Sequence, residues 1–327
     1  MKITYRSLAE VLSAVCSMSR YQEWITSKIP LYVTCILLSI YQLVEQGLIS
    51  NDIVFDAFLL LAQICLLSSF GYAINSFSDK KSDKLANKPN EFNFHSNSFC
   101  VTFVAFNIVC IFASSFFITS SSYLYFLFLF LSIVSSWSYS CLPLRLKERG
   151  IFGLITASLA QRFFPVMLIN STIGSWSVSL NLIAILSLLI GLRYISAHQI
   201  EDYENDLKSN TLTYTVTKGI KKIKFISRFF IYPLEVTLLI VVIVFLGNAA
   251  LFSIASMLIY IVSLLINKKL DKLLDGAKYF PFAPFYNFYM PVSLCIAISS
   301  IVYSGYSLMI TLVSVVVTFV FSSESRI

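Results

Sequence analysis

The chain has 327 residues, of which 57% are hydrophobic and 13% are charged, with a net charge of +7 and a mean hydropathy of +0.79. A soluble domain is less apolar and more charged, so the composition excludes that class. It predicts a multi-pass integral membrane protein embedded in the lipid bilayer, with no nucleic acid partner. The seven cysteines are scattered singly and form no CxxC pair, so we interpret them as packing residues and not as disulfides or zinc ligands.

Residues 1–28 form an N-terminal arm ahead of the first long apolar run. The arm contains no uninterrupted apolar segment followed by a cleavage site, so we do not expect a removable signal peptide. Residues 8–18 instead favour a short amphipathic helix on the membrane surface. The basic residues of the arm are Lys2, Arg6, Arg20 and Lys28.

Ten apolar runs long enough to span a bilayer follow the arm. They cover residues 29–46, 53–76, 98–118, 122–142, 151–170, 178–199, 225–246, 249–266, 287–303 and 306–322. Only Ser304-Gly305-Tyr306 separates the last two runs, so the count falls to nine if these form one bent helix. We therefore predict an all-α fold: a polytopic membrane bundle of nine or ten transmembrane helices in a single domain, 29–322, with a short tail, 323–327.

Basic residues fall almost entirely in alternate loops. The arm, the tail and the loops at 77–97, 143–150, 200–228 and 267–286 carry 22 of the 24 Lys and Arg residues, and the loops between them carry none. By the positive-inside rule, we predict that the N-terminus and the charged loops face the cytoplasm. An even number of spans puts the tail on the same side, which favours ten spans over nine.

The first acidic segment follows the second apolar run, in the sequence GYAINSFSDKKSDKLANKPN from residue 71 to residue 90. Asn75, Asp79 and Asp83 recur every four residues, so on a continuing helix they share one face. Converging oxygen ligands favour a hard cation such as Mg²⁺, which also relieves the repulsion between the carboxylates. Taken alone, the segment also fits a solvated charged turn, because lysines are interleaved with the acids.

The second acidic segment, AHQIEDYENDLKSN from residue 197 to residue 210, leaves the sixth apolar run on the same side. Asp202 and Asp206 are again four residues apart. If the bundle brings the two segments together, they can hold one or two Mg²⁺ ions and bind a phosphorylated substrate. Nearby, we favour a helix pair with Lys208 for Glu204. For His198 we favour a packed or hydrogen-bonded interfacial position over a ligand role, because the other candidate ligands are all oxygens.

Four further cations accompany these acids. Arg145 and Lys147 follow Pro143 at the end of the fourth run, where they either bind diphosphate oxygens or simply set the topology. An arginine inside a span is costly unless it faces the bundle interior or reaches the interface. Arg162 lies too deep to reach the interface easily, so we predict that it faces a buried anion. Arg193 fits either a structural ion pair or a substrate contact.

Together these motifs resemble the UbiA superfamily of intramembrane prenyltransferases. The segments that carry the resemblance are Asn75-x3-Asp79-x3-Asp83 with Lys88-Pro89-Asn90, then Tyr139-Ser140 through Pro143 to Lys147, then Asp202-x3-Asp206. They occur in the order of the family, at the ends of the second, fourth and sixth runs, and the resemblance extends over residues 20–320. The chain departs from the family pattern at Cys141-Leu142 and at His198-Gln199.

The resemblance implies a helical bundle around a central cavity that holds two Mg²⁺ ions and an isoprenyl diphosphate. The implied metal ligands are Asn75, Asp79, Asp83, Asp202 and Asp206. We assign diphosphate binding to Asn75, Lys88, Arg145, Lys147 and Arg162. The expected catalytic residues are the same four aspartates and Tyr139, whose ring would stabilise an allylic cation.

The implied activity is transfer of an isoprenyl group from its diphosphate to a lipophilic acceptor, for which an aromatic compound is our first expectation. On the same scaffold, the alternatives are cyclisation of the isoprenyl chain and transfer of a sugar phosphate to a polyprenyl phosphate. A cation-coupled transporter is an alternative from another class. It predicts inverted repeats and midplane carboxylates, whereas this sequence shows no clear repeat and places its acids at helix ends.

Overall fold

The computed structural model describes residues 7–174, 176–247, 249–266, 282, 285 and 290–301, and every regular element in these ranges is a helix. Eight of the helices are long and apolar enough to cross a membrane. They are α2 (Tyr21–Glu45), α3 (Asn51–Ser78), α5 (Asn97–Ser115), α6 (Tyr123–Ser140), α7 to α8 (Ile151–Thr172), α9 (Val178–Glu201), α12 to α13 (Ile220–Val244) and α14 (Ala249–Ile266). The prediction of an all-α multi-pass membrane protein is therefore confirmed.

The first eight predicted spans correspond to these eight helices. The first span begins earlier than predicted, at Tyr21 and not at residue 29, because Lys28 is buried inside the bundle and does not mark a water-exposed boundary. The ninth predicted span contains the 12-residue helix α16 (Met290–Ile301). The tenth span and the tail lie outside the described residues, so the choice between nine and ten spans stays a prediction.

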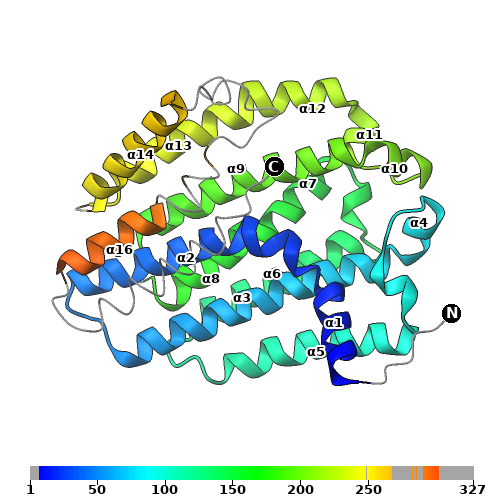
Figure 1. Ribbon diagram of the computed structural model, residues 1–327, viewed down its shortest axis with the longest axis horizontal. Coiled ribbons are helices and arrows are strands. Elements are labelled where there is room, and N and C mark those ends of the chain that lie inside the picture. Colours follow the sequence, from blue (N-terminus) through cyan, green and yellow to red (C-terminus); the bar gives the residue numbers. More distant parts are fainter. Residues whose placement is uncertain are drawn as a thin grey trace.

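The long helices lie side by side in one bundle (Figure 1). Helix α3 packs against α5 and α6, α9 packs against α7, α8 and α13, and α2 lies between α3, α8 and α16. The most apolar stretch of α2 is 83% buried, whereas those of α5 and α6 are 28% buried. The outer helices expose apolar side chains such as Phe106, Phe130 and Leu251, because the surrounding solvent there is lipid.

Short helices occupy the connections at one end of the bundle, which is the right-hand end in Figure 1. Helix α4 follows α3 directly, and α10 and α11 follow α9. The short elements are α1 (Leu8–Ser19), α4 (Lys80–Leu85), η1 (Glu91–Phe94), η2 (Leu146–Glu148), α10 (Tyr203–Lys208) and α11 (Tyr214–Lys218). Helix α1 confirms the helix predicted at residues 8–18, and it packs against α3 and η1. Its position on the membrane surface stays a prediction.

Two of the spans contain a π-helical turn just before a proline. In the fifth span, α7 (Ile151–Ser158) passes into η3 (Leu159–Phe163) and α8 (Phe164–Thr172), which contains Pro165. In the seventh, α12 (Ile220–Ile226) passes into η4 (Ser227–Ile231) and α13 (Tyr232–Val244), which contains Pro233. Proline has no N–H to donate to the carbonyl four residues earlier, and the backbone hydrogen bonds change there from the α-helical to the π-helical pattern. In the fifth span that carbonyl, of Gln161, accepts the hydroxyl of Tyr32 from α2.

Arg193 has a structural partner. Its guanidinium Nη1 lies 2.6 Å from Oε2 of Glu235 on α13, and both side chains are buried. The guanidinium also lies over the ring of Tyr232, 4.7 Å from the ring centroid. Of the two interpretations of Arg193, the structural ion pair is therefore confirmed, and it joins α9 to α13 within the membrane.

Candidate active site

Two membrane helices end in the same way at the two acidic segments. Helix α3 ends at Ser78 and helix α9 ends at Glu201, and Asp79 and Asp202 form the junctions to α4 and α10. Their backbone angles nearly match, with φ −93° and ψ 1° at Asp79 and φ −82° and ψ 0° at Asp202. The prediction of a continuing helix was wrong at this point, because each helix is interrupted at the junction aspartate, Asp79 or Asp202.

The match continues beyond the two junctions. Asp83 and Asp206 lie four residues further on, and their backbone carbonyls accept hydrogen bonds from the N–H groups five residues later, each at 2.8 Å. Their carboxylates accept hydrogen bonds from the side chains seven residues later, Asn90 Nδ2 at 2.7 Å and Thr213 Oγ1 at 3.0 Å. The structure therefore contains a local repeat that we did not find in the sequence, and both copies lie at the same end of the bundle.

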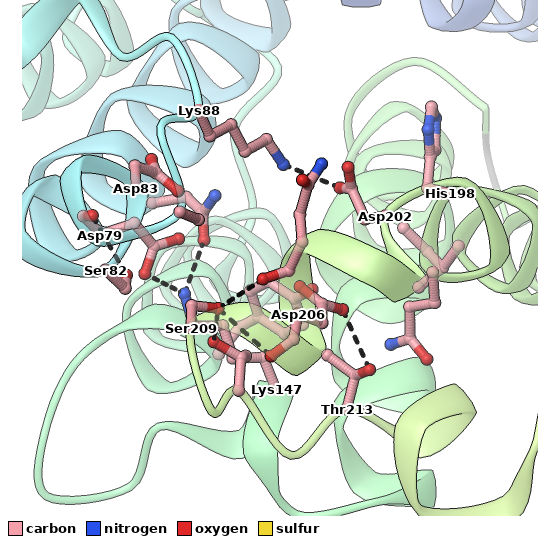
Figure 2. A pocket seen from close by; sticks show the side chains of 17 residues that line it. Asp79, Ser82, Asp83, Lys88, Lys147, His198, Asp202, Asp206, Ser209 and Thr213 are labelled. Carbon is pink, nitrogen blue, oxygen red and sulfur yellow. Dashed lines mark hydrogen bonds and ion pairs between the residues drawn. The ribbon is translucent and has the colours of Figure 1, made fainter.

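Both acidic segments line one cavity of about 120 Å³ (Figure 2). Asp79 and Asp83 approach it from one side, and Asp202 and Asp206 from the other. The sequence-predicted residues that line the cavity are Asn75, Asp79, Asp83, Lys88, Tyr139, Lys147, Asp202 and Asp206. The prediction that two distant acidic helix ends meet is thus confirmed by the structure.

Cations from other segments bind the two junction aspartates. The ammonium of Lys147, on η2, forms an ion pair with Oδ1 of Asp79, and both residues are buried. Arg145 Nη2 lies 3.4 Å from the same oxygen. Lys88 Nζ lies 2.8 Å from Oδ2 of Asp202 and so joins the two acidic segments across the cavity (Figure 2). Each junction carboxylate is therefore neutralised by a side chain that can also bind phosphate oxygens.

The other two aspartates carry charge that is poorly compensated. Burial raises the pKa of Asp83, and the charge of Asp79 raises it further, against the hydrogen bond from Asn90. Burial raises the pKa of Asp206 to about 6, and the charge of Asp202 adds to this, against the hydrogen bond from Thr213. A bound cation would stabilise the ionised form of both groups.

The donor set fits a hard divalent cation such as Mg²⁺, since its members are carboxylate and amide oxygens around one polar cavity. Within the described ranges, no group of three or more His, Cys, Asp or Glu side chains converges closely enough to enclose an ion. One or two protein carboxylates would therefore hold each ion and leave the other positions to water and phosphate oxygens, which is usual for Mg²⁺.

Three predicted or nearby residues lie away from the centre of this cavity. Arg145 touches Asp79 but is not among the lining residues, and it is also paired with Glu148, whose Oε1 lies 2.6 Å from its Nε. Arg162 lies in an adjoining cavity and does not line this one. His198 lies at the exposed rim, 3.6 Å from Glu201.

Asn90 and Thr213 donate hydrogen bonds to the second aspartate of each segment. The sequence analysis named Asn90 within a motif but gave it no role, and it did not name Thr213. Aligning the two acidic segments on their aspartates would have found them, because each lies seven residues after the second aspartate.

Residues 32–290, more than half of the chain, match the model of the UbiA prenyltransferase family. The chain belongs to this family. The protein is accordingly a membrane-embedded transferase of prenyl groups, and the resemblance found in its motifs is confirmed.

Solved structures of UbiA proteins share this fold. A UbiA homologue from Archaeoglobus fulgidus bound to GPP and Mg²⁺ is 17% identical, with a TM-score of 0.55, and the alignment covers 95% of this chain and 99% of that one. A further structure of a UbiA homologue from the same organism gives 17% identity, the same coverage and a TM-score of 0.54. A digeranylgeranylglyceryl phosphate synthase is 14% identical, with 96% and 99% coverage and a TM-score of 0.50. No curated protein sequence matches this chain significantly.

Proposed function

We propose that this protein is a Mg²⁺-dependent prenyltransferase that transfers the isoprenyl group of an isoprenyl diphosphate to a lipophilic, aromatic acceptor. The observation that carries the proposal is the cavity at the end of the spans that both acidic segments line, together with Lys147 from the η2 turn. The UbiA homologue that binds GPP and Mg²⁺ shares this fold and supports the choice of donor and ion.

We assign the metal ions to the side chains of Asn75, Asp79, Asp83, Asp202 and Asp206. When bound, Mg²⁺ would neutralise the charge that develops on the departing diphosphate. Lys147, Lys88 and Arg145 already lie beside the junction aspartates and would donate hydrogen bonds to the diphosphate oxygens. These cations lower the barrier to cleavage of the allylic C–O bond because they bind the leaving group more tightly as its charge grows.

Tyr139 is suited to a role on the isoprenyl side of the cavity. It lies at the end of α6, and its side chain lines the cavity together with Lys147 and Asp79. Its ring face can stabilise the positive charge that develops on the allylic carbon. The surrounding apolar helices exclude water, which would otherwise capture that carbon before the acceptor does.

The orientation of the protein in the membrane is a further part of this proposal. Both acidic segments lie at the end of the bundle that carries the described basic loops. The positive-inside rule therefore supports an active site and an N-terminal arm on the cytoplasmic side. Labelling of a cysteine introduced at Lys81 or at Ser120, in a chain whose seven native cysteines are replaced by serine, with an impermeant reagent tests this. Access to the Lys81 position from outside intact cells would contradict it.

The function is tested in proteoliposomes with a radiolabelled isoprenyl diphosphate, Mg²⁺ and a lipid extract as the source of acceptor. Asp79→Asn and Asp202→Asn are expected to lower turnover at least about 100-fold, because each removes a charge that holds metal at the leaving group. Asp52→Asn is the matched control, since Asp52 is an exposed acid at the opposite end of α3. Substantial turnover in either site variant, or full turnover in EDTA, would contradict the proposal.

The product identifies the reaction type in the same assay. A labelled adduct that contains the extract component supports transfer, whereas a labelled cyclic hydrocarbon indicates cyclisation. In a second arm, polyprenyl phosphate and a radiolabelled sugar phosphate activated by a diphosphate leaving group replace the isoprenyl diphosphate. A labelled polyprenyl phosphate that carries the sugar phosphate, with release of diphosphate, indicates sugar-phosphate transfer. The acids lie at helix ends and their local repeat is not inverted across the membrane, so the transporter alternative is not supported.

A further inference from the structure

A strongly basic stretch separates the second acidic segment from the apolar part of the seventh span. Between Asp206 and Glu235 the sequence contains no acidic residue, whereas residues 218–228 contain five basic ones. These are Lys218, Lys221, Lys222, Lys224 and Arg228. None of them lines the cavity of the acidic segments, so the function proposed above leaves these charges without a role.

The five basic side chains are exposed and lack a carboxylate partner. Every one of these residues is exposed, and within the described part of the chain none forms an ion pair. By contrast, Lys88, Arg145 and Lys147 each contact an aspartate of the acidic segments. Cations this close together in the sequence repel one another unless an anion neutralises them.

Three of the basic residues share one face of α12 and η4. Ile223 and Ser227, four residues apart, are buried and face the bundle. Lys221, Lys224 and Arg228 are separated by three and four residues, so they lie together on the outward side. The main packing partners of α12 are α11 and η4, its neighbours in the chain. The outward face therefore lies at the edge of the bundle, which is the upper edge in Figure 1.

An exposed aromatic cluster adjoins these cations. Phe225, Phe229 and Phe230 are each more than half exposed. The ring centroid of Phe225 lies 4.9 Å from that of Phe229 and 6.0 Å from that of Phe230. The guanidinium carbon of Arg228 lies 5.6 Å from the ring centroid of Phe229. Basic residues beside exposed aromatic rings are typical of helices at the boundary between lipid headgroups and acyl chains.

The seventh span places the cations at the depth of the headgroups. The apolar helix α13 follows η4 directly, so Phe229 and Phe230 lie where the chain enters the acyl region. Lys224 precedes Phe229 by five residues, which is about 7.5 Å along a helix axis. The headgroup region of one leaflet is about 5–8 Å thick. The ammonium of Lys224 therefore reaches the level of the phospholipid phosphates.

We propose that the surface formed by residues 218–230 binds the headgroup of an anionic phospholipid, in the leaflet at the active-site end of the bundle. The phosphate oxygens accept hydrogen bonds from Lys221, Lys224 and Arg228, and the acyl chains pack against Phe225 and Phe229. A zwitterionic headgroup binds less well, because its own cation meets the same cluster of cations. Each basic residue near an anionic surface contributes about fivefold in affinity.

The test measures lipid binding to the purified protein in detergent micelles by native mass spectrometry. Phosphatidylglycerol and phosphatidylcholine with identical acyl chains are the probes. We expect the wild type to bind phosphatidylglycerol at least tenfold more tightly than phosphatidylcholine, and to lose most of this preference at high salt, which screens exposed charges. Equal affinity for the two lipids would overturn the inference.

Paired substitutions separate this surface from the overall charge of the protein. Replacing Lys221 and Lys224 by glutamine should weaken phosphatidylglycerol binding at least about tenfold, and replacing both by arginine should retain it. The matched control replaces Lys81 and Lys84, two exposed lysines of α4, by glutamine and should bind like the wild type. An equal loss in both glutamine variants would show an effect of overall charge only and would refute the inference.

Phe225→Trp locates the lipid without removing a charge. The added fluorescence is the difference from the wild type, which has three tryptophans. Phosphatidylglycerol with brominated acyl chains should quench it at concentrations at which brominated phosphatidylcholine does not, and equal quenching by both would contradict the proposal. Displacement of phosphatidylglycerol by an equal concentration of inorganic phosphate would assign the surface to a free phosphate and overturn it. Thermal unfolding shows whether each variant is folded, and Phe225→Trp decides the question if the lysine variants do not fold.

Discussion

The position of Lys147 depends on a glycine in the next helix. Gly153 lies in the first turn of α7, against the η2 turn that carries Lys147. A Cβ atom at this position would lie 2.8 Å from the carbonyl oxygen of Leu146 and 2.9 Å from Cα of Lys147. Both neighbours are backbone atoms, so a rotamer change cannot relieve the clash. The substitution Gly153→Ala must move η2 relative to α7.

The required movement can be estimated from ordinary contact distances. To bring the closest contact to 3.4 Å, the backbone must shift by about 0.6 Å. Overpacking of this kind costs about 1–3 kcal/mol of stability, and displacement of a catalytic group by about 1 Å costs about 100-fold in rate. Because Lys147 is buried and paired with Asp79, its ammonium would move with the turn. We therefore expect turnover to fall between about 10-fold and about 100-fold.

Gly71→Ala is the matched control for this prediction. A Cβ at Gly71, on α3, would meet only Ser136, at 3.5 Å from its Oγ, which is an ordinary contact. Alanine is favoured over glycine within a helix, so this variant should unfold at the same or a higher temperature and turn over normally. Turnover and thermal unfolding are measured for both variants in the same micelles. Wild-type turnover in folded Gly153→Ala would refute the view that this contact positions Lys147.

Three further predictions follow from individual contacts. Lys88→Met should raise the KM for the isoprenyl diphosphate about tenfold, because one charge-assisted hydrogen bond is lost, and steady-state kinetics would contradict this if KM did not change. Glu235→Gln should destabilise the fold by about 3–5 kcal/mol, because Arg193 keeps its buried charge without a carboxylate; thermal unfolding measures this, and an unchanged unfolding temperature refutes it. Asp206, whose pKa is raised from 3.8 to about 6, stabilises the ion-free fold below pH 3.8 and loses this contribution as pH rises through 6. Protons then compete with Mg²⁺ below pH 6, so the rise in unfolding temperature on adding Mg²⁺ should be larger at pH 7.5 than at pH 5, and an equal rise at both would contradict the assignment.

The placement of both acidic segments on one face of the membrane could be predicted because it depends only on topology, whereas their meeting also depends on how the helices pack. Each segment follows an apolar run of spanning length, and the distribution of basic residues places both on one face of the membrane. The interruption at Asp79 and Asp202 could not be predicted, since a four-residue spacing fits a continuing helix equally well. The local repeat was missed because its two copies share few side chains beyond the aspartates, with Asn75 matched by His198.

Arg162 and Arg193 show where reasoning from one sequence reaches its limit. Both are arginines within apolar runs, and the same cost argument applies to each. The structure separates them through residues remote in the chain: Glu235 on α13 lies against Arg193, whereas Lys28 on α2 lines the same cavity as Arg162. The carboxylate partner gives Arg193 a structural role, whereas the second cation makes the surroundings of Arg162 a candidate anion site. Which of these holds is decided by helix packing, so the sequence indicated that both arginines face the interior but not what each one meets there.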